Sequence, residues 1–197
     1  MPGLLLRCYD VAYRWLHGLR DPAAGAGPVV RVAVRRHRGP TVVLRDGTAV
    51  RRGDRIGIIH LDNERVAAFH GDGSQTPIAG LRFRRAFVAS LRELARQVLD
   101  TDRYAGVQAF TTQTIMHAGT QRAGFEILPL RSSTWSRVVA AYERALLARY
   151  HPRGRRGARR HRFTDARAIW ISRDGLLSRY GPEHCAPARG AAPEASP

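Results

Sequence analysis

An amphipathic segment at residues 82–100 constrains the fold of this chain more than any other feature. Its apolar side chains recur at the spacing of a helix and its arginines fall on the opposite face; the apolar positions are Phe87, Leu91, Leu94, Ala95, Val98 and Leu99. We therefore predict a helix over 82–100 that packs one face against a core. Strand-like runs precede and follow it, so we expect helices and strands to be interleaved.

Three stretches before this helix predict strands, at Val29–Arg36, Thr41–Leu44 and Ala49–Leu61, the last with an irregular middle. The run "VVLRDGTAV" is typical of a hairpin, because Asp46-Gly47 can take the positive φ angles of a tight turn. The tetrapeptide "RRGD" at 51–54 predicts a second turn before the apolar run "RIGIIHL".

After the helix, "VQAFTT" at 107–112 predicts a strand, and "TIMHAGTQRAGFEILPL" at 114–130 predicts a short helix, a glycine and another strand. Gly124 stands where the end of a helix favours a left-handed residue, and Phe125 can fold back onto the last helical turn. This pattern is explained by the folding of the chain and does not require a cofactor site.

The remaining segments complete a coarse secondary structure. We predict a short helix at 62–70, an exposed loop at 71–80, an amphipathic helix at 134–150, an arginine-rich loop at 151–163, a strand "ARAIWIS", and a short helix "RDGLLSRYG" that Ser172 caps. Together these elements predict one α+β domain at 29–182, with a mixed or antiparallel sheet flanked by helices. An N-terminal amphipathic helix and linker (1–28) would precede it, and a disordered tail (183–197) would follow.

The chain is strongly basic and contains no lysine. Its formal net charge is +17, and all 33 cationic side chains are arginine. Such a charge favours anionic partners, yet arginine in place of every lysine, with abundant Ala, Gly and Pro, is also typical of a GC-rich genome. The absence of lysine excludes a Schiff-base enzyme and a P-loop of the usual kind.

Cysteine usage and hydropathy bear on the compartment. The two cysteines, Cys8 and Cys185, form neither a CxxC pair nor a disulfide framework. The first ten residues lack the apolar core of a signal peptide, and no run approaches the length of a transmembrane helix. We therefore expect a cytoplasmic protein. The eight histidines show neither HxH nor HExxH spacing, so we expect no metal site.

Residues 4–19 have two interpretations. They predict a basic amphipathic helix with Trp15 on its apolar side, which suits peripheral contact with a membrane. A helix of this kind also gains stability by docking on its own domain, which is the commoner arrangement.

Several short motifs, in their order and spacing, resemble the YkoP-like domain. They are the hairpin "LRDGT", the "GD" turn, "HLDN", the strand end "TT" and "RAGFEI", which together cover roughly residues 29–130, and the final "WISRDGLLSRYG" also fits. This bacterial domain occurs alone or fused to polysaccharide deacetylases, and its genes accompany envelope-glycan enzymes. The resemblance implies a link to envelope polysaccharides and brings no established catalytic residue.

A second, partial resemblance concerns the C-terminal half of GNAT acyltransferases, whose layout residues 82–130 share. In those enzymes a glycine-rich turn before the long helix binds the pyrophosphate of acetyl-CoA through backbone N–H groups. The corresponding turn here, "TPIAGLRFRRA", has the single glycine Gly80, with Leu81 and Phe83 nearby. The shared layout therefore indicates a remote or degenerate GNAT-like fold.

Among the short polar stretches, "HLDN" at 60–63 is the strongest candidate for a functional site. His60 and Asp62 fall on one face of an extended strand, and Asn63 opens a helix. One interpretation is a binding or acid–base pair, with His60 titrating near neutrality. The other is that Asp62 or Asn63 caps the helix while His60 satisfies a local hydrogen bond.

Two further groups of residues are candidates for binding. Hydroxyl groups at the carboxyl end of a strand could hold a glycan or a phosphate, or only turn the chain; they belong to Thr111, Thr112 and Thr114. The arginine-rich loop could bind anions or be a solvated insertion, and its candidates are Arg153, Arg155, Arg156, Arg159, Arg160 and Arg162.

These observations favour a non-catalytic accessory or ligand-binding module without a cofactor. Its partners would be envelope-glycan enzymes or an anionic small molecule. Two alternatives remain open: an N-acyltransferase that uses acetyl-CoA, and a basic nucleic-acid-binding protein. The loop lacks interleaved aromatic residues and no helix-turn-helix is evident, so nucleic acid is the less favoured partner.

Overall fold

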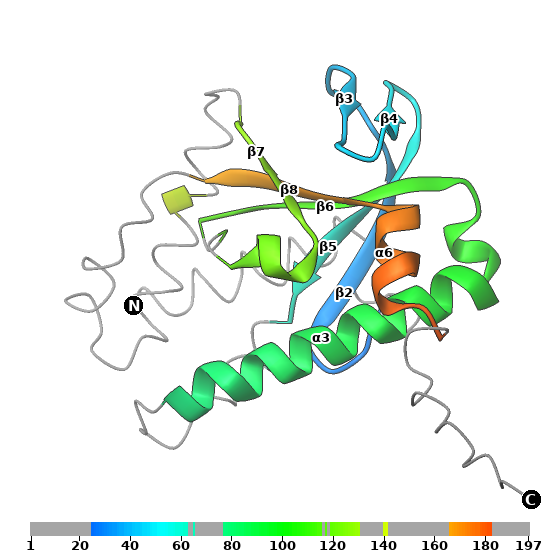
Figure 1. The fold of residues 1–197 in the computed structure, drawn as a ribbon. Coiled ribbons are helices and arrows are strands. Elements are labelled where there is room, and N and C mark those ends of the chain that lie inside the picture. The colour runs from blue at the N-terminus through cyan, green and yellow to red at the C-terminus, as the bar shows by residue number, and fades with distance from the viewer. Residues whose placement is uncertain are drawn as a thin grey trace, which may run out of the picture.

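The computed structural model of the protein describes residues 25–62, 65, 77–115, 117, 119–130, 140–141 and 166–182. Six strands form one sheet in the order β1-β2-β5-β6-β8-β7 (Figure 1). Their bounds are β1 Gly25–Ala26, β2 Val30–Arg36, β5 Arg55–Leu61, β6 Val107–Thr114, β7 Glu126–Leu128 and β8 Arg167–Ser172. Strands β5 and β6 are parallel, and every other described pair in this sheet is antiparallel. The sheet is therefore mixed, which confirms the predicted α+β class.

Helix α3 (Pro77–Asp100) connects the two parallel strands and runs along one face of the sheet (Figure 1). Leu91, Leu94 and Val98 are buried in the core beneath it, as the helical spacing predicts. Leu99 was expected on the same face but is 53% exposed, because it lies about 100° further around the helix than Val98.

The start of α3 differs from the prediction. Residues 77–80 were expected in an exposed loop, but they form the first turn of the helix. Proline suits the first helical position, where its φ angle is already helical and an N–H would have no partner within the helix. Pro77 therefore begins the helix instead of interrupting it.

A small antiparallel hairpin, β3 (Val42–Val43) and β4 (Ala49–Val50), lies beyond the other face of the sheet (Figure 1). With the sheet it encloses a second core that contains Leu44, Val50 and Trp170. The hairpin confirms the sequence prediction, but in its turn only Gly47 has a positive φ angle, +87°. Asp46 instead accepts a hydrogen bond of 2.9 Å from the N–H of Thr48 through its carboxylate.

The helix–glycine–strand unit is present in a shorter form. Strand β6 continues to Thr114, and the helix is a single 3-10 turn, η3 (Thr120–Ala123). Gly124 follows with a φ angle of +85°, and the N–H of Phe125 bonds to the carbonyl of Thr120 at 3.1 Å. The predicted left-handed end is thus confirmed, and Phe125 is buried against α3.

The last described elements are β8 and helix α6 (Arg173–Tyr180), which lies beside α3 (Figure 1). The hydroxyl of Ser172 accepts a hydrogen bond of 2.8 Å from the N–H of Gly175, so the predicted cap is confirmed. The predicted helices at 4–19 and 134–150 and the tail at 183–197 lie outside the described residues, apart from two helical residues, Ala140 and Ala141.

Candidate functional site

The most distinctive part of the sheet is the place where its two parallel strands separate. The paired register of β5 with β6 runs from Arg55 and Val107 to Ile58 and Thr111. Both strands then continue for three more residues, to Leu61 and Thr114. The carboxyl ends of parallel strands commonly carry ligand sites in α/β folds. His60 and the three candidate threonines all come from these ends.

Asp62, directly after β5, is buried and fully engaged in structural contacts. Its Oδ2 lies 3.2 Å from Nε of Arg31 and 3.7 Å from Nε of Arg65. Its Oδ1 accepts a hydrogen bond of 3.3 Å from the N–H of Arg65, which is helical. The capping role predicted for Asp62 is therefore observed, and its charge is balanced by two guanidinium groups. Asn63, the other predicted cap, lies outside the described residues.

His60 lies opposite Arg31 of β2 in the antiparallel register and is partly buried. Side chains alternate along a strand, so His60 and Asp62 share one face of the sheet, as predicted. Arg31 reaches the same face through its ion pair with Asp62. This face is the one opposite α3.

The three threonines are divided between the two faces of the sheet. The hydroxyl of Thr111 is buried and donates a hydrogen bond of 2.9 Å to the carbonyl of Ile169 in β8. Alternation places Thr111 on the same face as His60, and Thr112 and Thr114 on the face of α3. The structure thus brings Thr111 toward the "HLDN" cluster but separates it from the other two hydroxyl groups.

Gln113, which lies between Thr112 and Thr114, was not among the site residues predicted from the sequence. Its Oε1 is buried and has no hydrogen-bond partner in the described part of the chain. Alternation places its side chain on the face of Thr111 and His60, and its partner in β8 is Ala168, which has no polar side chain. The same period of two, read across "TTQT", would have separated Gln113 from its neighbours and grouped it with Thr111.

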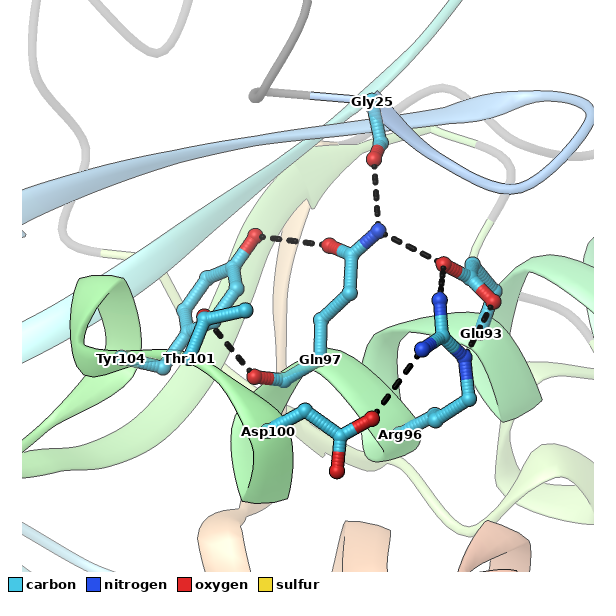
Figure 2. Close-up of polar contacts among 7 residues, drawn as sticks. All are labelled: Gly25, Glu93, Arg96, Gln97, Asp100, Thr101 and Tyr104. Atoms are coloured by element: carbon cyan, nitrogen blue, oxygen red, sulfur yellow. Dashed lines mark hydrogen bonds and ion pairs between the residues drawn. The ribbon is translucent and has the colours of Figure 1, made fainter.

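A polar cluster at the C-terminal part of α3 is satisfied internally (Figure 2). Arg96 is held between Glu93, at 2.6 Å, and Asp100, at 3.0 Å. Gln97 donates to Glu93 and to the carbonyl of Gly25 in β1, at 2.8 and 3.0 Å. The hydrogen bond from Arg96 is the main cause that lowers the pKa of Glu93 below its ordinary value. Although a cavity of about 320 Å³ opens beside this cluster, its polar groups bind one another and tie β1 to the helix.

One comparison with known proteins decides the family. The model of the YkoP domain matches residues 4–180. The chain belongs to the YkoP family. No curated protein and no solved structure matches it. The match confirms the resemblance drawn from the hairpin, the turns and "RAGFEI".

Several arginines of this YkoP domain serve its backbone. Arg173 donates to the carbonyls of Val98 and Tyr104, each at 3.0 Å. Arg55 donates to the carbonyls of Arg103, at 2.9 Å, and of Ala105. The planar guanidinium offers several donors in a fixed geometry, so one arginine can satisfy two carbonyls near helix ends. These arginines are structural.

The remaining predictions for the YkoP domain concern anion binding, metal binding and membrane-spanning helices. The anion-binding candidates of the loop at 151–163 lie outside the described residues. Within the described ranges, no three side chains of the kinds that bind metals come together, and no helix is long and apolar enough to cross a membrane.

Proposed function

We propose that this YkoP domain is a non-catalytic module that binds a hydrogen-bond-donating ligand between the carboxyl ends of β5 and β6. The observation that carries the proposal is the buried Oε1 of Gln113, which accepts no hydrogen bond within the described residues. A buried acceptor without a donor costs about 1–3 kcal/mol, so a ligand that supplies the donor gains that free energy. His60 and Thr111 lie on the same face of the sheet as this acceptor.

The contacts that Asp62 and Thr111 already make within the domain support binding rather than catalysis. A general base needs a carboxylate or imidazole that is available to a substrate. Asp62 instead caps Arg65 and pairs with two guanidinium groups. The hydroxyl of Thr111 already donates to the backbone of β8. Both groups shape the site without taking part in a reaction.

A carbohydrate of the cell envelope is the ligand class that fits best. Sugars carry several hydroxyl donors, and N-acetylated sugars add an amide N–H. The resemblance to domains fused to polysaccharide deacetylases points to the same class. A cytoplasmic location, in keeping with the cysteine pattern, and an association with envelope-glycan enzymes are part of this proposal.

Calorimetric titration of the full chain tests the proposal, with a tetrasaccharide of N-acetylglucosamine and its deacetylated counterpart as probes. We expect saturable binding of the acetylated form, and weaker binding of the cationic form because the chain carries a net charge of +17. Gln113→Leu should abolish binding without loss of stability, since it removes an acceptor that has no donor. Gln108→Leu is the matched control, because Gln108 is exposed on the same strand. Failure of both sugars to bind, or full affinity in Gln113→Leu, would contradict the proposal.

One observation favours an acyltransferase of GNAT descent as a second candidate. The unit β5–α3–β6, with parallel strands that separate, matches the layout of those enzymes. The turn that would bind phosphate argues against this candidate, because residues 77–80 are helical and Pro77 has no N–H to donate. Saturable binding of acetyl-CoA in the same calorimeter would promote this candidate, and we expect none.

A further inference from the structure

A second surface, separate from the β5–β6 site, is formed by α3, η3 and α6. Residues 81–92 of α3 contain four arginines and no acidic residue, whereas residues 93–100 contain Glu93, Arg96 and Asp100. The basic character of the helix is thus confined to its N-terminal half. All acidic side chains of this helix lie in the cluster of Figure 2.

These three elements carry five exposed arginines, which we call the basic patch: Arg84, Arg85, Arg92, Arg122 and Arg179. None forms an ion pair with a carboxylate among the described residues. Arg179 is fixed by a hydrogen bond of 2.5 Å to the carbonyl of Arg122, which joins α6 to η3. Burial raises the pKa of Tyr180, while the charges of Arg179, Arg92 and Arg84 act on its hydroxyl in the opposite direction. Arg84, Arg92 and Arg179 therefore lie near one hydroxyl group, and Arg179 joins them to η3.

Apolar side chains alternate with the arginines along α3. Leu81, Arg85, Val88 and Arg92 follow one another at spacings of four, three and four residues, so they lie along one side of the helix. Leu81 is 46% exposed and Val88 is partly exposed. A stripe of this composition suits the boundary between lipid headgroups and acyl chains, where guanidinium groups bind phosphates and apolar groups insert.

We infer that the basic patch and Leu81 bind the domain to an anionic lipid surface. Nucleic acid is the other polyanion that arginines attract, but proteins that bind single strands stack bases on aromatic side chains. On this surface the described phenylalanines pack against one another: Phe83 stacks on Phe87, and Phe87 packs against the buried Phe125. The exposed leucine favours lipid.

The test is co-sedimentation of the full chain with phosphatidylcholine vesicles that contain a third of phosphatidylglycerol. The triple variant Arg84→Gln/Arg85→Gln/Arg92→Gln should lose about fivefold in affinity per arginine, or roughly a hundredfold in total. The matched control is Arg38→Gln/Arg51→Gln/Arg52→Gln, which changes the net charge equally beside the hairpin β3–β4. It should lose much less. Leu81→Ser should weaken vesicle binding several-fold and leave binding to a duplex oligonucleotide unchanged.

Three results would overturn the inference. The first is the absence of wild-type binding to the anionic vesicles at physiological salt. The second is an equal loss in the triple variant and its control, because net charge would then explain the binding. The third is an oligonucleotide affinity that depends on the basic patch together with a vesicle affinity that does not, which would assign the surface to nucleic acid.

Discussion

The hydroxyl of Tyr180 donates a hydrogen bond of 2.9 Å to the carbonyl of Ala123, so the last residue of α6 holds the last residue of η3. The preceding residues repeat this contact, because Arg179 donates to the carbonyl of Arg122. Two residues of helix α6 thus bind the carbonyls that directly precede Gly124, and so stabilise the turn at this glycine. The turn serves the fold, and its glycine is explained without a cofactor.

Substitution of Gly124 should destabilise the protein for two reasons. Its φ angle is +85°, and a Cβ atom would lie 2.9 Å from Cδ of Arg179. We expect Gly124→Val to lower the free energy of unfolding by about 1–3 kcal/mol, measured by chemical denaturation. Gly119 has the same φ angle but nothing within 4 Å of its Cβ position. Gly124→Ala should therefore cost more than Gly119→Ala, and equal losses would show that the contact with Arg179 is unimportant.

Gly57 of β5 should tolerate no side chain. A Cβ atom there would lie 2.3 Å from Cδ1 of Phe110, a fully buried ring in the adjacent strand. We expect Gly57→Ala to cost about 1–3 kcal/mol through overpacking. The double variant Gly57→Ala/Phe110→Leu should be more stable than the sum of the single changes predicts. Strict additivity in that cycle would contradict the packing explanation.

Arg173→Lys tests the structural role of the arginines. The ammonium group cannot reproduce two hydrogen bonds from one planar group to the carbonyls of Val98 and Tyr104. We expect a loss of about 1–3 kcal/mol in the free energy of unfolding. Arg92→Lys, at an exposed position of α3, should have almost no effect. An Arg173→Lys variant with an unchanged free energy of unfolding would mean that these carbonyls do not require the two donors of a guanidinium group.

Glu93 should make stability depend on pH in the acid range. Its folded pKa is lowered, chiefly by the hydrogen bond from Arg96. The ionised carboxylate therefore stabilises the fold above its unfolded pKa, about 4.3, and this contribution is lost as the pH falls through the folded pKa. We expect Glu93→Gln to show a shallower fall of unfolding free energy below about pH 4. Identical pH slopes would show that the pair with Arg96 contributes nothing.

Local patterns predicted much of the fold. The spacing of Leu91, Leu94 and Val98 identified α3, and Gly124 identified the end of η3, because such features depend on neighbours along the chain. The first turn of α3 and the exposed side of Leu99 were predicted incorrectly. Asp46 was expected to share a positive φ angle with Gly47, but a hydrogen bond to Thr48 satisfies it in another turn geometry.

The candidate site was harder to predict from the sequence, because it depends on contacts between strands that lie far apart along the chain. The parallel register of β5 and β6 brings His60 and Gln113 to one face, and no local pattern distinguishes parallel from antiparallel pairing. The burial of Asp62 depends on Arg31, in another strand. An unsatisfied acceptor such as Gln113 Oε1 is recognised only when its surroundings are known.

The most direct measurement of the proposed function is an NMR titration of the labelled chain with the N-acetylglucosamine tetrasaccharide. The proposal predicts that the side-chain amide of Gln113 and the imidazole of His60 shift with one common saturation curve. The side-chain amide of Gln97, in the cluster of Figure 2, should stay unchanged. Shifts at Gln97 without shifts at Gln113, or no saturable shift at Gln113, would contradict the assignment of the site to the ends of β5 and β6.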